Sequence, residues 1–352
     1  MKKSRLQIFM VLIVTLIFAM GLVLTGCSME GDKSGNAPPA AEDTKKPESP
    51  SGGESGEGKK IGFSIAMLAG SPFWQIISDE LERGFKELGY EFVVLDAQGD
   101  AAKQASDVED LIAQKVDIIL VNPYDSDAIV PVTLSARDAG IPVMAVDIPV
   151  AEAGYSIATC ICDNVMLGYQ LGEYAADKFN TPEVKVVVIS GYPNGIDSRQ
   201  RRHGFIEGFH AKQLEKFAQT GLRIVHHGWG DYAREPANKT MEDAITRTNG
   251  DFDIVYCEND DMAIGALRAM ESANITGKMI LGVDGLKEMY ELIRDGYTTA
   301  TGRNSPVELA AVSVQATHDY LNGKEIPEII FTTPTVVEKK NIDEFYDPDS
   351  IF

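Results

Sequence analysis

Basic residues and histidines are scarce in this chain. Its 352 residues include 32 Lys and Arg against 53 Asp and Glu, which gives a formal net charge of −21, and only five His. Surfaces that bind nucleic acid or anionic membranes are rich in Lys and Arg, and the part of the chain expected to fold has no cluster of that kind. Neither partner is therefore expected for it, whereas a small neutral ligand is compatible with this composition.

Known catalytic motifs are missing as well. The sequence contains no Gly-x-Ser-x-Gly, no phosphate-binding loop, no dinucleotide fingerprint and no His-Glu-x-x-His. The Gly-rich stretch before residue 60 lacks the flanking strand and helix that a phosphate loop needs. We therefore expect a protein that is not an enzyme and that holds no cofactor.

Cysteine is rare, with four residues in all. Besides Cys27, the chain has Cys160, Cys162 and Cys257, an odd number for an exported protein. Cys160 and Cys162 have the spacing of neighbours on one face of a strand, where side chains point in parallel. A metal site would need a fourth ligand and a characteristic spacing, and neither is present. We expect three small core residues and no metal site.

The N-terminus has the pattern of an export signal. Three basic residues within the first five precede an apolar run over 8–24, and Leu-Thr-Gly-Cys follows, ending at Cys27. This ending resembles a bacterial lipobox, in which the Cys is acylated and becomes the first mature residue. A plain membrane helix is the alternative, because the run is marginally long enough to span a bilayer. We predict a lipoprotein signal peptide over 1–27 and an extracytoplasmic protein anchored to the cell membrane through Cys27.

A linker is predicted over 28–60. This segment is rich in Gly, Ser, Pro, Glu and Lys and almost free of apolar side chains. Such a composition cannot bury enough surface to offset the entropy lost on ordering. It should form a flexible tether between the anchor and the folded part.

The first folded unit consists of a strand, a helix and a second strand. A short apolar run over 61–67 precedes a Gly-Ser-Pro turn signal, which is typical of a buried strand. Ser71 is expected to cap the helix, and Pro72 suits its first position, where a missing N–H has no partner. Gly89 ends the helix, and an apolar strand follows. Strand and helix patterns alternate in this way to residue 337, so the fold class is α/β with parallel sheets.

One pattern occurs twice. A strand beginning at Asp117 leads through a helix to a strand ending at Asp147, 30 residues further on. A strand beginning at Asp253 leads in the same way to Asp284, 31 residues further on. The repeat predicts two similar, doubly wound parallel-sheet lobes.

Residues at the carboxyl ends of these strands should meet between the two lobes. Carboxylates accept pairs of hydroxyl hydrogen bonds, Asn and Arg add donors, and aromatic rings cover the apolar faces of a ring-shaped polyol. This mixture suits a sugar. The residues are Ser71, Phe73, Trp74, Asn122, Asp147, Arg199, Trp229, Tyr232, Asn259 and Asp284.

Several ordered motifs closely resemble those of the ribose-type family of bacterial periplasmic sugar-binding proteins, the substrate-binding components of ABC importers. The resemblance covers nearly all of 61–341. It implies the type I periplasmic binding protein fold, in which three crossings of the chain form a hinge between the lobes. The motifs are Ser-Pro-Phe-Trp from Ser71, Asn-Pro-Tyr-Asp-Ser-Asp from Asn122, Arg-Gln-Arg-Arg-His-Gly-Phe from Arg199, Glu-Asn-Asp-Asp-Met-Ala from Glu258 and Gly-Val-Asp-Gly around Asp284.

The resemblance implies that the chain captures a small sugar or polyol in an interlobe cleft and delivers it to the membrane permease of an ABC importer, as a monomer. The sugar-contacting residues would be Ser71, Phe73, Trp74, Asp147, Arg199, Tyr232, Asn259, Asp284 and Asn304. The N-terminal lobe would comprise 61–162 and 304–332, the C-terminal lobe 163–303 and 333–345, with crossings near 161–163, 302–305 and 332–335.

Two departures bear on the ligand. Ribose binders have an Arg after the first of these aspartates, where this chain has Ile148, and an Asn where it has Ser71. Ribose itself therefore does not follow from the resemblance. Ser71 could also act only as a helix cap, Phe73 as a core residue and Arg199 in a surface ion pair, and either aspartate could be structural. Asn122 fits a role in holding the Pro-Tyr turn better than one in ligand binding, and Trp229 is not assigned to the site. The same binder could instead serve a surface signalling receptor, with a sugar, a cyclitol or an autoinducer as its ligand.

Overall fold

The computed structural model describes residues 58–69, 72–193, 195–350 and 352. The predicted leader peptide with Cys27, nearly all of the linker, and Ser71 lie outside this range. Among the residues described, no helix is both long and apolar enough to span a bilayer.

The first sheet has six parallel strands in the order β11-β5-β4-β3-β1-β2. Strands β3 and β4 are buried along their whole length, as expected for a parallel sheet covered by helices on both faces. The strands are β1 (Lys60–Ile65), β2 (Glu91–Asp96), β3 (Ile118–Asn122), β4 (Val143–Val146), β5 (Ala158–Cys162) and β11 (Ile329–Thr332).

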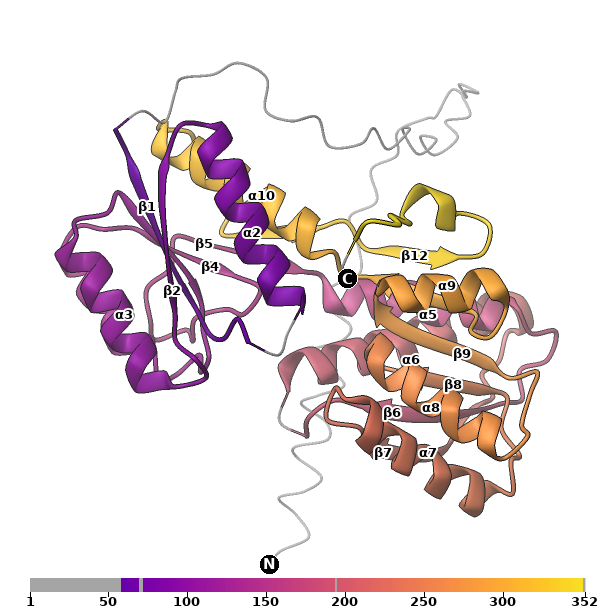
Figure 1. Ribbon diagram of the computed structural model, residues 1–352. Helices are drawn as coiled ribbons and strands as arrows, with labels where there is room; N and C mark the ends of the chain where they lie inside the picture. The colour runs from indigo at the N-terminus through magenta and orange to yellow at the C-terminus, as the bar shows by residue number, and fades with distance from the viewer. Residues whose placement is uncertain (1–57, 70–71, 194, 351) are drawn as a thin grey trace, which may run out of the picture. The chain divides into compact units, whose positions relative to one another are not determined.

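Helices cover both faces of this sheet, and α2, α3 and α10 can be followed in Figure 1. Helix α2 begins at Pro72, as predicted, and packs with α10 on one face, where Leu81 and Leu309 belong to the same core. Helices α3 and α4 pack on the other face through residues such as Leu111 and Ala136. The helices are α2 (Pro72–Glu87), α3 (Ala101–Ala113), α4 (Val130–Asp138) and α10 (Pro306–Leu321).

The second sheet repeats this plan in the order β12-β10-β9-β8-β6-β7, with β12 antiparallel to β10 and the other pairs parallel. Its strands are β6 (Val184–Ser190), β7 (Leu222–Trp229), β8 (Ile254–Cys257), β9 (Met279–Asp284), β10 (Ala300–Arg303) and β12 (Thr335–Glu338). Its helices are α5 (Asn164–Asp177), α6 (Ile196–Phe217), α7 (Arg234–Thr248), α8 (Asp260–Ser272), α9 (Lys287–Asp295) and the short η1 (Ile342–Glu344).

The chain passes between the two sheets three times. It does so from β5 to α5, from β10 to α10, and from β11 to β12. The predicted fold class, two similar parallel-sheet α/β lobes joined by three crossings, is confirmed. The last strand pattern, over 328–337, is divided into β11 and β12 at the crossing expected near 332–335, because the two halves pair in different sheets.

Helices α5 and α6 pack with their backbones in close approach. A Cβ atom added at Gly172 would lie 2.1 Å from the carbonyl oxygen of Phe205, and one at Gly208 would lie 2.0 Å from that of Tyr169. Side chains at these positions would push the helices apart. The pairing matters for function because α6 carries polar residues of the candidate site.

The three cysteines of the folded part are buried, as predicted, and the structure leaves them free. Cys160 and Cys257 are fully buried and Cys162 is 3% exposed. Burial raises the pKa of the Cys160 thiol to about 11. These thiols therefore stay protonated and act as small core side chains.

Candidate functional site

Two aspartates end matched strands of the two sheets. Asp147 directly follows β4, and Asp284 is the last residue of β9. Both have a positive φ, 70° at Asp147 and 122° at Asp284. Such backbone is uncommon outside glycine, and Asp is among the residues that tolerate it best. Each carboxylate is thus left at the carboxyl edge of its sheet, where ligands of open parallel sheets bind.

Asp147 lies against the first turn of α2. The indole Nε1 of Trp74 donates to Asp147 Oδ2 at 3.1 Å, and Trp74 and Phe73 are half-buried against the core of the first lobe. Burial raises the pKa of Asp147 to about 6; the Trp74 N–H lowers it, the charge of Asp197 raises it, and Arg201 lowers it. A carboxylate with an indole partner keeps lone pairs that can accept hydroxyl hydrogens.

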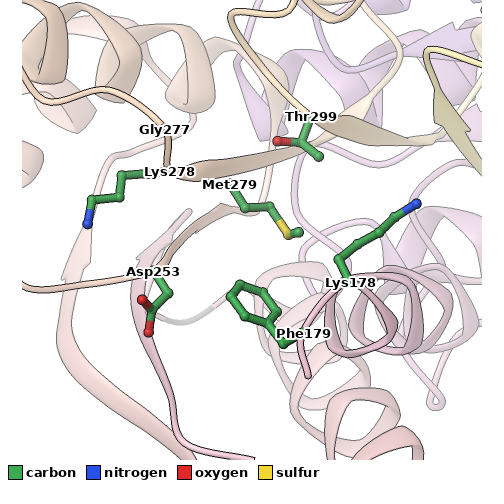
Figure 2. A pocket seen from close by; sticks show the side chains of 7 residues that line it. All are labelled: Lys178, Phe179, Asp253, Gly277, Lys278, Met279 and Thr299. Atoms are coloured by element: carbon green, nitrogen blue, oxygen red, sulfur yellow. The ribbon is translucent and has the colours of Figure 1, made fainter. Parts of the chain in front are cut away.

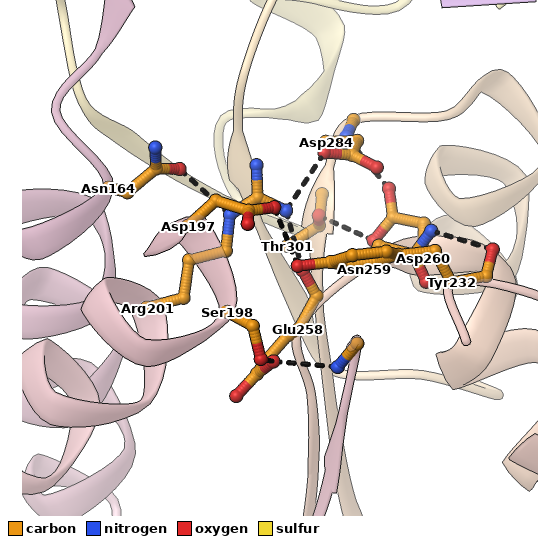
Figure 3. A network of polar contacts seen from close by, with 12 residues as sticks. Asn164, Asp197, Ser198, Arg201, Tyr232, Glu258, Asn259, Asp260, Asp284 and Thr301 are labelled. Atoms are coloured by element: carbon orange, nitrogen blue, oxygen red, sulfur yellow. Dashed lines mark hydrogen bonds and ion pairs between the residues drawn. The ribbon is translucent and has the colours of Figure 1, made fainter. Parts of the chain in front are cut away.

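The structure corrects the choice of arginine. Arg199 is exposed, whereas Arg201 is 5% exposed and lies beside Asp284. Arg201 Nε donates to Asn164 Oδ1 at 2.8 Å, and its Nη1 donates to the Glu258 carbonyl oxygen at 2.6 Å. The same Nη1 lies 3.4 Å from Asp284 Oδ1 (Figure 3).

Helical geometry explains the difference. Two residues along an α-helix turn the side chain by about 200°, so Arg199 and Arg201 point to nearly opposite sides of α6. Arg201, Phe205 and Phe209 recur at intervals of four, and Phe205 and Phe209 are buried in the core of the second lobe. This stripe was the sequence signal that singles out Arg201 among the neighbouring arginines.

Glu258 supports the start of α6. Its side chain is fully buried, and its carboxylate accepts hydrogen bonds from groups at the end of β6 and in the first turns of α6. Burial raises the pKa of Glu258, and these donors lower it. The network ties the helix that carries Arg201 to the edge of the sheet. The partners are Ser190 Oγ at 2.7 Å, the Gly191 N–H at 2.8 Å, Ser198 Oγ, and Arg202 Nη1 at 3.1 Å.

Tyr232 contacts a residue that sequence reasoning missed. Its hydroxyl donates to Asp197 Oδ2 at 2.6 Å, and its ring lies so close to Gly191 that a Cβ there would be 2.0 Å from it. The hydroxyl is therefore engaged, and the ring is the part of Tyr232 left for a ligand. Asp197 lies in the first turn of α6, where a carboxylate is also favoured by the helix dipole.

Two asparagines complete the set. Asn259 Oδ1 accepts from the Met262 N–H at 2.9 Å and so caps α8, while its Nδ2 donates to the Tyr232 carbonyl oxygen at 3.3 Å. Asn304 is 4% exposed, and its Oδ1 has no hydrogen-bond partner among the residues that the structure describes. Its side chain lowers the pKa of Asp284, which burial raises to about 7 and Arg201 lowers. An orphan acceptor beside a buried carboxylate is suited to a ligand donor.

The predicted residues fall into three groups. Contacts and charges link Trp74, Asp147, Tyr232, Asn259, Asp284 and Asn304 to one another through Arg201 and Asp197, which were not predicted. Phe73 lies in the same turn as Trp74, with its ring 5.5 Å from that of Phe352. Arg199 points away, and Ser71 lies outside the described residues.

A cavity in the described part of the chain lies away from these residues. It measures about 430 Å³ and lies in the second lobe (Figure 2). Asp253 and Met279 line it at the start of β8 and β9, at the edge opposite the candidate site. Its polar groups are engaged, since Lys178 Nζ pairs with Glu338 at 3.2 Å and Asp253 Oδ2 accepts from the Lys185 N–H. No cluster of three metal-ligating residues occurs among the residues placed by the structure.

Comparison with known proteins agrees with this geometry. Residues 61–325 match the family described as periplasmic binding protein domain. The ribose import binding protein of Bacillus subtilis is 34% identical over 272 residues, which are 77% of this chain and 84% of the relative. The chain belongs to the ribose-type periplasmic sugar-binding protein family.

Solved structures of such proteins share the fold of this family member. An ABC transporter solute binding protein from Mycobacterium smegmatis with bound glycerol matches with a TM-score of 0.72 and 31% identity, over 83% of this chain and 98% of that one. A periplasmic solute binding protein from Actinobacillus succinogenes with bound D-allose matches with a TM-score of 0.72 and 25% identity, over 82% and 100%. The type I periplasmic binding protein fold is therefore confirmed.

Proposed function

We propose that this protein is an extracytoplasmic solute-binding lipoprotein that captures a small sugar or polyol at the facing strand ends of its lobes and delivers it to an ABC importer. The acylated Cys27 would anchor it, and residues 28–60 would tether the folded part. The lobes would comprise 61–162 with 304–332 and 163–303 with 333–345.

One observation carries the proposal. Asp147 and Asp284 occupy equivalent strand ends of the two lobes, each with a buried neighbour whose oxygen has no partner within the described part of the chain. Those neighbours are Asn122 and Asn304, each with an unpaired Oδ1. Hydroxyl groups are both donors and acceptors, and a polyol presents several of them in a fixed arrangement. Trp74 and Tyr232 add aromatic surface for the apolar C–H faces of such a ligand.

The ligand itself is the first question for experiment. A thermal-shift screen of pentoses, hexoses, polyols and nucleosides with the soluble folded part should reveal a compound that raises the melting temperature, because ligand binding to the folded state alone stabilises it. Calorimetry would then measure the affinity. A complete screen without any stabilising sugar or polyol would contradict the proposal.

Two variants separate the site from the rest of the surface. Arg201→Lys should weaken binding, because a Lys ammonium cannot reproduce the bond to Asn164 together with the bond to the Glu258 carbonyl. Arg199→Lys, on the exposed side of the same helix, is the matched control and should bind as the wild type does. Equal affinities of both variants would remove Arg201 from the site.

A further inference from the structure

Asp197 is a third carboxylate at the candidate site. It lies in the first turn of α6, one turn before Arg201, and is half-buried. Its Oδ2 accepts from the Tyr232 hydroxyl at 2.6 Å. Within the described residues, neither Asp197 nor Asp147 forms an ion pair, whereas Asp284 lies 3.4 Å from Arg201.

The charges of the site do not balance. Among the described residues of the site, three carboxylates share one guanidinium, that of Arg201. The carboxylates are those of Asp147, Asp197 and Asp284. They also repel one another, since Asp197 raises the pKa of Asp147 and Asp147 raises that of Asp284. Other charged groups nearby already have protein partners. The buried carboxylate of Asp260 accepts from the Thr301 hydroxyl at 2.7 Å and from the N–H groups of Gly285 and Leu286. Glu258 pairs with Arg202, and Asp261 pairs with Arg234.

The uncharged groups have the same bias toward accepting hydrogen bonds. Asn122 and Asn304 are 1% and 4% exposed, and the side-chain atom without a partner is the oxygen in each. Arg201 has already committed its Nε and Nη1 to protein acceptors. The site thus offers several acceptors and few free donors, which favours a ligand with many donors, and a cationic one most of all.

We propose that Asp197 is a specificity-determining residue, and that the unbalanced carboxylates make the site prefer a sugar or polyol carrying a protonated amine over the same molecule with a hydroxyl group. This inference rests on the proposed sugar-binding function. A protonated amine donates three hydrogen bonds and accepts none, and charge-assisted bonds are about twice as strong as neutral ones. The same imbalance opposes a ligand carboxylate.

Matched ligand sets test the preference with the wild-type protein. Glucose, galactose, mannose and sorbitol would be compared by calorimetry at about pH 7 with glucosamine, galactosamine, mannosamine and 1-amino-1-deoxysorbitol, and with glucuronate and galacturonate. In at least one set the amine should bind about tenfold tighter than the hydroxyl compound, and the uronates should bind weakest, because hydrogen bonds to charged partners contribute about 1.4 kcal/mol more than neutral ones. Added salt should reduce the preference.

The variant Asp197→Asn tests the residue. Asn can still accept the Tyr232 hydroxyl, so the local geometry is kept while the charge is removed. Affinity for the amine should fall about tenfold, and affinity for the hydroxyl compound should change less than about threefold. Asp295→Asn, which removes an exposed charge at the end of α9, is the control and should change neither. A melting curve without ligand checks that each variant is folded.

The outcomes separate the two proposals. Binding of neutral sugars or polyols without any gain from the amine would overturn this inference and leave the sugar-binding function standing. An amine preference that survives Asp197→Asn unchanged would remove Asp197 from that role. No binding of any compound in the sets or in the wider screen would overturn both. The wild-type comparison holds even if the variant fails to fold.

Discussion

At the scale of the residue, Asp147 is set up for binding at a cost to stability. Burial raises the pKa of Asp147 to about 6, so the ionised form is disfavoured in the folded, ligand-free protein. We expect Asp147→Asn to raise the free energy of unfolding at about pH 8 by roughly 1 to 3 kcal/mol, since one pKa unit corresponds to 1.36 kcal/mol. Asn also tolerates the φ of 70° at this position.

The same variant should bind sugar at least about tenfold more weakly, because an Asn amide accepts fewer hydroxyl hydrogens than a carboxylate. Denaturant unfolding and calorimetry measure the two effects. At about pH 5 the stability gain should fall to about half, and it should vanish only below about pH 4, where the carboxyl is protonated in both the folded and the unfolded state. A variant that is less stable than the wild type at about pH 8, or that binds equally well, would contradict this account of Asp147.

The two aspartates also predict how binding depends on pH. Burial raises the pKa of Asp284 to about 7 and that of Asp147 to about 6. As the pH falls through these values the free site takes up protons, and a protonated carboxyl accepts fewer hydroxyl hydrogens. Affinity for a neutral sugar should therefore fall by at least about tenfold between about pH 8 and pH 5.

The stability of the ligand-free protein should change in the opposite direction. A carboxyl whose pKa is higher in the folded than in the unfolded state binds its proton more tightly when folded, so these two groups make folding more favourable as the pH falls from about 8 to 5. Calorimetry and thermal melting over this range measure both trends. A flat affinity profile would mean that the carboxylates do not contact the ligand.

Residue-scale reasoning from the sequence succeeded where a residue ends a repeated strand. Asp147 and Asp284 follow from the repeat alone. It failed for the three arginines within 199–202, because the choice among them followed the motif and not the apolar stripe of Phe205 and Phe209 on the same helix. Asp197 and Glu258 were missed for a related reason, since their roles depend on contacts with Tyr232 and Ser190 that are distant in the sequence.

At the scale of the element, the close packing of α5 on α6 should control the position of Arg201. A methyl group at Gly172 would lie 2.1 Å from a backbone oxygen of α6, which cannot move aside as a side chain can. Gly172→Ala should therefore lower the free energy of unfolding by about 1 to 3 kcal/mol, the usual cost of overpacking, and should weaken sugar binding through displacement of α6.

Gly84→Ala is the matched control, because Gly84 lies in α2 where this helix packs on α10 of the first lobe. Its added methyl would lie 2.9 Å from a side-chain carbon of Val314 rather than from a backbone atom, and a side chain shifts at a lower cost than a packed helix backbone, so the loss should be smaller. Chemical denaturation of both variants measures the difference. Equal losses would show that the backbone contact between α5 and α6 has no special importance.

Element order was predictable because apolar runs and turn residues recur regularly. Pairing was not predictable in the same detail. The run over 328–337 is interrupted by Thr-Thr-Pro-Thr at 332–335, where β11 ends and β12 begins, but nothing local indicates that β11 joins β5 while β12 joins β10. Partners in a sheet are set by contacts far apart in the sequence, and these decide where the third crossing falls.

At the scale of the whole molecule, the lipobox predicts where the protein is held. Cys27 follows an apolar run with Leu-Thr-Gly before it. Cys27→Ser should abolish incorporation of labelled fatty acid and release the protein from membranes or leave it unprocessed. The Cys257→Ser variant, which changes a buried core thiol, serves as the control and should still be labelled. Labelling of the Cys27 variant would exclude this anchor.

The last prediction concerns motion between the two lobes. Three short connections join the sheets, and hinges concentrate large dihedral changes in a few residues at such places. A sugar that bonds to both Asp147 and Asp284 has contacts with each lobe, and it gains both sets only when the lobes approach. Because a ligand shifts an equilibrium by its differential affinity for the two states, it should favour the closed arrangement.

Small-angle X-ray scattering should therefore give a smaller radius of gyration for the soluble folded part with saturating sugar than without it. Asp284→Asn is the informative variant, since it should weaken the contact with the second lobe while Asp147 keeps its contact with the first. At sugar concentrations that saturate this variant, closure should be less complete than in the wild type, because the difference in affinity between the open and closed states is smaller. Identical scattering of free and saturated wild-type protein would exclude closure about the three connections, and the sugar would then have to bind to lobes that are already in place.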